Sequence, residues 1–596
     1  MCQFICAQHD SIVKLEEVQV SDSQLKKFSN TQSVLQLNDS IIHKNKASLT
    51  SLLNYNSVLY FKENGLGMVS SVSFRGTTAQ QTAVIWNGIN INSQFNGQTD
   101  FNTISARDFN SVSIRAGGGS SVYGSSAIGG SIHLNNDLIF GKRFDNTLQL
   151  NYGSFNTANV NYTMQASGER FSSQVSISRN SSDNDYPYLD TNQKNENGQF
   201  YNTSVNVNLG YRLNAKNVLK LYSCLFESER HFSGTLAAPS KSKYEDLNTR
   251  NLLEWVGSYG RFTSKLKAAF LSEAYKYYEN AANPIFNTAN AKTLIAKYDL
   301  NYRVNPNMEW NAILDYTQNK GVGEEIGINT RQITSGVLLL KHSPFKKFLY
   351  EIAVRKELTN DYRSPVLFSV GTNYSVTDFY KVKVNGSRNF RIPTFNDLYW
   401  QGSGNSDLKP ESSYQIEVGN DFKFNNTRFS LTGYYIKIQD LLRWTPGSGG
   451  NWSPSNVAKV STYGAEVLLH TTKRIGQNQF DFNATYGYTV SQDEEKEKQL
   501  IYVPFHKFTA ALAYSFKNLS AHYQYLYNGK VFTSSDNFYS IDDYLVSNVG
   551  IAYAFGKQKS LQLGFDALNI FNEKYQSVSP RPMPGRNYTI NLIFNL

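Results

Sequence analysis

The chain has 596 residues and a formal net charge of +10, and its mean hydropathy is polar although 14% of its residues are aromatic. A soluble core of this size normally relies on Leu, Ile and Val, whereas abundant Tyr and Phe in a polar chain suit a wall with one apolar and one wet face. Lys and Arg are scattered and form no stripe, which argues against a nucleic-acid-binding surface.

The first residues carry little structural signal. We interpret Met1 to Gln8 as the remnant of a signal peptide, although they lack a charged region and a full apolar run. The three cysteines show neither a disulfide framework nor metal-binding spacing, and two of them lie in this segment.

A compact N-terminal region comes next, and we place it at residues 30–140. Ala47 to Tyr55 has helical spacing of leucines, with Ser48 as its N-cap. Short apolar runs follow, and a Gly/Ser-rich stretch from Ala116 to Gly130 closes the region. This pattern predicts a small α+β domain.

Residues 145–596 show a different and repetitive pattern. Segments of nine to twelve residues alternate apolar and polar side chains, as in Val205 to Leu213, Phe508 to Phe516 and Tyr588 to Leu596. Such alternation is the period of a strand with one lipid-facing and one wet face. No stretch approaches the roughly 18 apolar residues of a membrane-spanning helix, so any membrane crossing must be made by a closed barrel.

The connections between these segments also alternate, between short turns and long polar loops, as bacterial outer-membrane barrels do. We count 22 strands. A lumen of that size needs a plug, and a domain of suitable size precedes it. Soluble propellers and sandwiches are the alternative, but they show repeats or more even loops. We therefore predict an all-β membrane protein, a 22-stranded antiparallel transmembrane β-barrel with an N-terminal α+β plug domain in its lumen.

Several motifs resemble those of the TonB-dependent receptor family, in the family's order and over nearly the whole chain. They are Val72–Gly76, Ala83–Gly88, Ser113–Gly117 and Ser121–Gly130 in the plug, and Phe390–Tyr399, Gly404–Glu411, Asn569–Tyr575 and Pro584–Tyr588 in the barrel. The resemblance implies active transport of a scarce, bulky nutrient across the bacterial outer membrane, among outer-membrane lipids, and no enzymatic activity. We expect Arg75 and Arg115 to pair with carboxylates of the barrel wall.

A short segment before the plug resembles the family's TonB box. It consists of Leu15, Glu16, Glu17, Val18, Gln19, Val20 and Ser21. The resemblance implies that the inner-membrane protein TonB pairs with this extended stretch by β-augmentation and pulls on the plug.

Two plug loops resemble those of cobalamin receptors, especially the forms from Bacteroidetes-type bacteria, some of which carry a capping surface lipoprotein. The resemblance implies that these loops form the floor of the substrate site. The residues concerned are Thr77, Thr78, Gln80, Gln81, Asn92, Gln94, Phe95, Asn96 and Gln98. Their amides and hydroxyls suit a ligand rimmed by carboxamides, and Phe95 would pack on its apolar face.

Other functions stay open at this point. A ferric siderophore is the main alternative, although anionic catecholates favour converging cations, which these loops lack apart from Arg75. Haem receptors of the family carry a histidine between the motifs at Phe390 and Leu408, and none occurs here. An outer-membrane enzyme would need a Ser-His or Asp-His set, for which we find no paired candidates. A passive porin or adhesin would need neither plug nor TonB box.

One long loop is rich in oxygen ligands and is a tentative calcium site. Its acidic residues are Asp183, Asp185, Asp190 and Glu196. Some cobalamin receptors bind Ca²⁺ in the matching loop, and hard cations need such clusters. The spacing here departs from that pattern, so a solvated polar loop is the competing interpretation.

Overall fold

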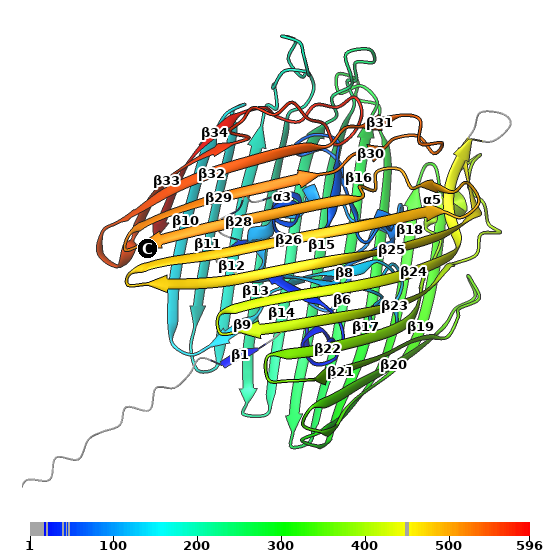
Figure 1. Cartoon of the computed structure of the whole chain (residues 1–596). Coiled ribbons are helices and arrows are strands. Elements are labelled where there is room, and N and C mark those ends of the chain that lie inside the picture. Colours follow the sequence, from blue (N-terminus) through cyan, green and yellow to red (C-terminus); the bar gives the residue numbers. More distant parts are fainter. Residues whose placement is uncertain (1–16, 20–21, 38–40, 43–44, 46–47, 447–451) are drawn as a thin grey trace, which may run out of the picture.

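The computed structural model describes residues 17–19, 22–37, 41–42, 45, 48–446 and 452–596. The signal-peptide remnant proposed at residues 1–8, and all of the TonB-box segment except residues 17–19, lie outside the described residues. The described chain forms a closed barrel around a smaller N-terminal domain (Figure 1).

The barrel wall is entirely antiparallel, and it closes where β10 pairs with β34. Apart from the two-residue β27 (Lys498–Gln499), the barrel described has 22 strands, which confirms the predicted fold. They are β10 (Arg143–Gly153), β11 (Thr157–Ser167), β12 (Phe171–Ser182), β13 (Phe200–Asn214), β14 (Asn217–His231), β15 (Lys243–Tyr259), β16 (Phe262–Tyr278), β17 (Asn287–Asn305), β18 (Met308–Gly323), β19 (Gly327–Phe345), β20 (Phe348–Leu358), β21 (Leu367–Ser375), β22 (Tyr380–Arg391), β23 (Glu411–Phe424), β24 (Thr427–Pro446), β25 (Trp452–Ile475), β26 (Asn478–Asp493), β28 (His506–Phe516), β29 (Leu519–Asn528), β32 (Tyr544–Phe555), β33 (Leu561–Leu568) and β34 (Asn587–Asn595).

The strands alternate apolar side chains outward and polar side chains inward. On β13, Leu209 and Tyr211 are exposed on the outer surface, whereas Asn206 and Asn208 are buried in the lumen. An outer face of exposed Leu, Val, Phe and Tyr is what a lipid-facing wall requires. The tight turns, such as residues 168–170 and 306–307, gather at one rim, and the long loops gather at the other, at the top of Figure 1.

The plug is built on a five-stranded mixed sheet in the order β2-β7-β8-β5-β6. Only β5 and β8 run parallel. The strands are β2 (Val34–Leu37), β5 (Thr82–Trp86), β6 (Ile89–Asn90), β7 (Ser111–Ala116) and β8 (Gly130–Asn135). Two smaller pairs join β1 (Glu17–Gln19) to β9 (Leu138–Phe140) and β3 (Tyr60–Glu63) to β4 (Ser70–Ser73). In the barrel, the loop between β29 and β32 contains the pair of β30 (Val531–Phe532) and β31 (Ser540–Ile541).

Helix α3 lies between the plug and the barrel wall, in contact with β3 of the plug and with β26, β28 and β29 of the wall. It spans Leu49–Asn56, and the Ser48 hydroxyl accepts from the backbone N–H of Ser51 at 3.3 Å, as an N-cap does. Leu49, Leu52 and Leu53 are fully buried in a core that continues onto the barrel wall. The other helices are α1 (Ser23–Lys27), α4 (Ser120–Tyr123) and α5 (Phe395–Tyr399), with 3-10 turns η1 (Ala79–Gln81), η2 (Phe101–Thr103), η3 (Ala106–Asp108) and η4 (Lys557–Lys559).

In the part of the chain that the structure describes, no helix combines the length and the apolar character needed to cross a membrane.

Candidate functional site at the plug apex

A buried ion-pair cluster fixes the turn after β4 to the barrel wall. Arg75 Nη1 lies 2.6 Å from Glu417 Oε2, and Arg75 Nη2 lies 2.8 Å from Glu466 Oε2. The guanidinium also lies over the Tyr434 ring, 4.4 Å from its centroid. Arg75 itself has φ of 52°, so the turn aims this side chain sideways into the wall. The predicted pairing of Arg75 with barrel carboxylates is confirmed.

The same prediction for Arg115 is wrong. Its side chain is buried, and its Nε and Nη1 have no hydrogen-bond partner among the described residues. The guanidinium instead lies 5.8 Å from the centroid of the Tyr123 ring. Burial lowers the pKa of Arg115, and the wall carboxylates Glu417 and Glu351 oppose this only through longer-range attraction, without a direct ion pair in the described chain.

In the first predicted substrate loop, residues 77–81, some side chains are buried and hold the loop in place. The Gln81 amide donates to Glu411 Oε2 at 2.6 Å, and its oxygen accepts from the backbone N–H of Thr78 at 2.9 Å. Thr77 is buried and donates to the Phe74 carbonyl at 2.7 Å. Thr78 and Gln80 keep part of their side chains accessible. These two are therefore the residues of this loop that are free to meet a ligand.

The second predicted loop, residues 92–98, is held from inside by Asn92. Its side chain accepts from the Val84 N–H at 2.8 Å and donates to the Thr82 and Gly97 carbonyls, both at 3.0 Å. Phe95 is only 2% exposed and packs edge-on against Tyr275. Contact between Phe95 and a ligand therefore requires the loop to move.

The barrel loop that contains α5 is hydrogen-bonded to this second plug loop. The backbone N–H groups of Phe395 and Asn396 on α5 donate to the carbonyls of Gln94 and Phe95, at 3.0 and 3.1 Å. From the wall, Glu273 Oε1 accepts from the Ser93 hydroxyl at 2.6 Å. Sequence inspection missed these wall partners, because residues so far apart in the chain give no local signal of contact.

The accessible side chains of the two predicted loops are neutral and polar. They are those of Thr78, Gln80, Gln94, Asn96 and Gln98. Amides and hydroxyls both donate and accept hydrogen bonds, so this surface matches a ligand whose rim is also built of neutral amides.

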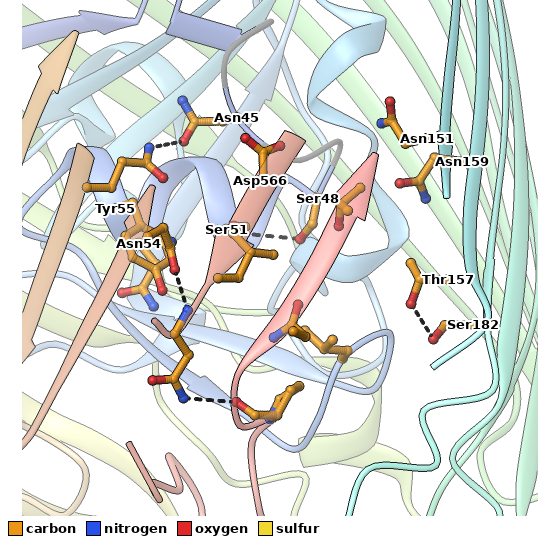
Figure 2. A pocket seen from close by; sticks show the side chains of 18 of the residues that line it. Asn45, Ser48, Ser51, Asn54, Tyr55, Asn151, Thr157, Asn159, Ser182 and Asp566 are labelled. Carbon is orange, nitrogen blue, oxygen red and sulfur yellow. Dashed lines mark hydrogen bonds between the residues drawn. The ribbon is translucent and has the colours of Figure 1, made fainter. Parts of the chain in front are cut away.

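A cavity of about 440 Å³ runs between the plug and the arc of wall where the barrel closes (Figure 2). On the plug side Ser48, Ser51 and Asn54 of the α3 region face it, and on the wall side Asn151 and Asn159 stand opposite each other on β10 and β11. Amide and hydroxyl side chains line it together with apolar residues and with the charged Glu63, Arg107 and Asp566. The space therefore suits water and polar groups.

The N-terminal segment is attached to the plug at two points. Residues 17–19 pair antiparallel with Leu138–Phe140, the edge strand that leads into the barrel. Asp22 then caps α1 by accepting from the Leu25 N–H at 3.1 Å, and its Oδ2 lies 2.8 Å from Nδ1 of the buried His133. Burial raises the pKa of Asp22, but the contact with His133 outweighs this and holds it below its usual value.

The loop proposed as a calcium site holds its acidic residues apart. Asp185 pairs with Lys194, and Asp190 Oδ1 lies 2.7 Å from the Lys574 ammonium. Among the residues described, no three His, Cys, Asp or Glu side chains gather in a way that could hold a metal ion. Calcium binding by Asp183, Asp185, Asp190 and Glu196 stays a prediction.

Two family models match this chain. The model described as TonB dependent receptor-like, beta-barrel covers residues 141–570, and the TonB-dependent Receptor Plug Domain covers residues 26–131. The chain is a TonB-dependent receptor. It is therefore an outer-membrane transporter, its loop rim faces the outside of the cell, and it is not an enzyme.

Relatives of this TonB-dependent receptor include two vitamin B12 transporters named BtuB. The one from Photobacterium profundum is 23% identical over 88% of this chain and 86% of its own length. The one from Vibrio vulnificus is also 23% identical, over 95% and 93%. These two relatives lend no support to the likeness to Bacteroidetes-type receptors that the plug loops suggested.

Solved structures with the same fold transport different cargo. The copper transporter OprC superposes with a TM-score of 0.80 at 13% identity, covering 95% of this chain and 98% of its own. The siderophore receptor PirA from Acinetobacter baumannii gives 0.77 at 14% identity, covering 97% and 99%. At these identities the likeness shows the fold alone.

Proposed function

We propose that this receptor imports cobalamin. The observation that carries the proposal is the neutral amide and hydroxyl surface of the plug apex, formed by Thr78, Gln80, Gln94, Asn96 and Gln98. Cobalamin is rimmed by carboxamides, which can exchange hydrogen bonds with such a surface. The two vitamin B12 transporters that are similar over most of the chain support the same substrate.

A ferric catecholate is a poorer match to this apex. Such ligands are anionic and are held best by converging Arg or Lys side chains. Arg75, the arginine beside the first loop, is already engaged by Glu417 and Glu466 beneath the apex. Its charge is therefore neutralised by the two wall glutamates and is not available to a ligand.

Residues 15–21 precede the plug, where a pull by TonB could be passed on to it. We propose that TonB takes this segment as an added strand of its own sheet. In the resting receptor, residues 17–19 already pair with Leu138–Phe140, so TonB must exchange one strand pairing for another. The pull would then reach the plug through Asp22, which binds both α1 and His133.

The cavity beside α3 lies on the side where the plug is packed most loosely against the barrel wall. At about 440 Å³ it is a pocket for a drug-sized molecule at most, and cobalamin is far larger. Passage therefore requires part of the plug to move. The loosely filled side, facing Asn151 and Asn159, is where we propose that the path opens.

Uptake of labelled cyanocobalamin by cells tests this function. The receptor is expressed in a strain that lacks its own cobalamin receptor but retains TonB, and a strain without TonB is the control. We expect uptake that depends on both proteins. Uptake that is unchanged without TonB, or absent in both strains while the receptor is folded in the outer membrane, would contradict the proposal.

A further inference from the structure

Two lysines on the outer face of the barrel stand directly opposite each other on neighbouring strands. Lys292 on β17 is the cross-strand partner of Lys320 on β18. Both lysine side chains are exposed, whereas the residues next to them along the strands, Thr293 and Asn319, are buried on the lumen side. Because successive side chains of a strand point to opposite faces, both lysines point outward, toward the lipid.

The lysine pair lies at the outer edge of the apolar surface of the wall. Strand β17 starts at the loop rim, and on its outer face Lys292 is followed by apolar and aromatic side chains only, from Leu294 to Tyr302. These nine residues match the length of strand that crosses the hydrocarbon layer, about 9–11 residues when tilted. The lysines therefore lie at the level of the lipid headgroups in the outer leaflet of the membrane.

Neither lysine of the pair has a carboxylate partner within the described part of the chain. Neither ammonium group forms an ion pair or a hydrogen bond there. The next residues in the same cross-strand row, Ser272 on β16 and Thr330 on β19, are uncharged. By contrast, two other outward lysines of this side of the wall, Lys243 and Lys276, lie 3.0 and 3.3 Å from the carboxylate of Glu245.

The two ammonium groups repel each other unless an anion lies between them. Cross-strand partners have Cβ atoms about 4.5–5.5 Å apart, and like charges directly opposite each other are destabilising. One phosphate group can accept hydrogen bonds from both ammonium groups, and lysine is a common phosphate ligand. The hydroxyls of Ser272 and Thr330 flank the pair in the same row and are further donors to such an anion.

We propose that Lys292 and Lys320 form a docking site for the phosphorylated headgroup of a lipid in the outer leaflet. The acyl chains of this lipid would lie along the exposed Leu294 and Leu314, which continue the outer face of β17 and β18 toward the middle of the membrane. A lipid fits better than soluble phosphate, because this face of the wall is covered by the membrane. The proposal depends on the location of the receptor in the outer membrane and is independent of its cargo.

Native mass spectrometry of the full-length receptor in a neutral detergent tests this site. The receptor is titrated with lipid A, a diphosphorylated glycolipid, and with its fully dephosphorylated form. We expect lipid A to bind at least tenfold more weakly to the double variant Lys292→Gln/Lys320→Gln than to the unmodified receptor. Replacement of both lysines by arginine is expected to retain binding, and the dephosphorylated lipid is expected to bind all these proteins equally weakly.

The charge-matched control is Lys346→Gln/Lys347→Gln, which removes two exposed lysines from the short turn between β19 and β20 at the opposite rim. We expect this control to bind lipid A as the unmodified receptor does.

Thermal unfolding in the same detergent gives a second measurement. Without lipid, the variant with glutamine at positions 292 and 320 is expected to have a higher Tm than the unmodified receptor, because the repulsion is removed. Lipid A is expected to raise the Tm of the unmodified receptor more than that of this variant. Equal affinity of both proteins for lipid A, or an equal loss of affinity in the control, would overturn the proposal. Inorganic phosphate that binds this pair as tightly as lipid A would assign the site to a free anion and would also overturn it.

Discussion

Arg75 of the plug and Glu417 of the barrel wall form a buried ion pair, with 2.6 Å between Nη1 and Oε2. Glu466 closes the cluster from β25, so a single plug side chain joins two wall strands. Both glutamates are buried, and removal of the arginine would leave two like charges side by side without compensation. This contact thus holds the plug to the barrel, and removing only one of its partners is costly.

Replacement of Arg75 by Gln tests this attachment. We expect the free energy of plug unfolding to fall by about 3–5 kcal/mol, the usual cost of breaking a buried pair. Urea-dependent loss of protease protection in the plug, while the barrel persists, measures it. Arg179→Gln is the control, because Arg179 is exposed and lies over Tyr201 outside the barrel. A loss no larger than in that control would contradict the assignment.

Asp22→Ala tests the attachment of the N-terminal segment. The change removes a helix cap and the hydrogen bond to the buried His133, so α1 is expected to loosen by about 2–3 kcal/mol. Proteolysis near residue 22 is then faster, while ligand binding at the distant apex is retained. Ser105→Ala serves as control, since Ser105 precedes η3 without a side-chain cap bond. Equal proteolysis of the two variants would refute the role of Asp22.

Asp108 gives the plug a defined pH dependence. Burial raises its pKa to about 6, although the hydroxyl of Ser204 donates to it at 2.7 Å. The folded plug therefore keeps a proton that the unfolded chain releases above its ordinary pKa of 3.8, so this group makes the plug less stable as pH rises from about 4 to 6. Between pH 4 and 7 the loss amounts to about 2–3 kcal/mol.

Asp108→Asn removes that dependence. Plug unfolding in urea is measured for both proteins at pH 4 and pH 7, and the change between the two pH values is compared. The unmodified protein is expected to lose about 2–3 kcal/mol more than the variant on going to pH 7. Identical changes in the two proteins would show that Asp108 titrates as an ordinary carboxyl.

Val18→Pro tests the use of residues 15–21 as a strand. Proline has no N–H, so the backbone pairing that joins Val18 to Ile139, and the strand pairing that we propose with TonB, would be interrupted. We expect cyanocobalamin uptake to be lost while binding persists, as also on deletion of residues 15–21. Glu17→Gln leaves the backbone unchanged and is expected to retain uptake. Undiminished uptake by the proline variant would rule out this segment.

Much of the fold was predictable because it depends on local periodicity. The alternation in Val205 to Leu213 became β13, with its apolar residues on the lipid side, and the cap at Ser48 became the start of α3. These features depend on neighbours along the chain. Strand count followed from the same local signal, since each turn or loop separates one apolar-polar segment from the next.

The site was less predictable, because its contacts join distant parts of the chain. Gln81 belongs to a predicted substrate loop, yet its amide is bound to Glu411 and lies inside the protein. Phe95 is likewise enclosed by Tyr275. Arg75 and Arg115 have similar local sequences, but only the turn geometry at Arg75 directs its side chain to wall carboxylates. Such differences arise from tertiary packing alone.

The central claim, cobalamin transport, is tested most directly by equilibrium binding of labelled cyanocobalamin to the purified receptor, with a ferric catecholate siderophore as competitor. The account predicts saturable binding that the siderophore does not displace. It also predicts at least tenfold weaker binding when Gln80 and Asn96 of the apex are both replaced by Ala. Absence of cyanocobalamin binding by a folded receptor that binds the ferric siderophore would contradict it.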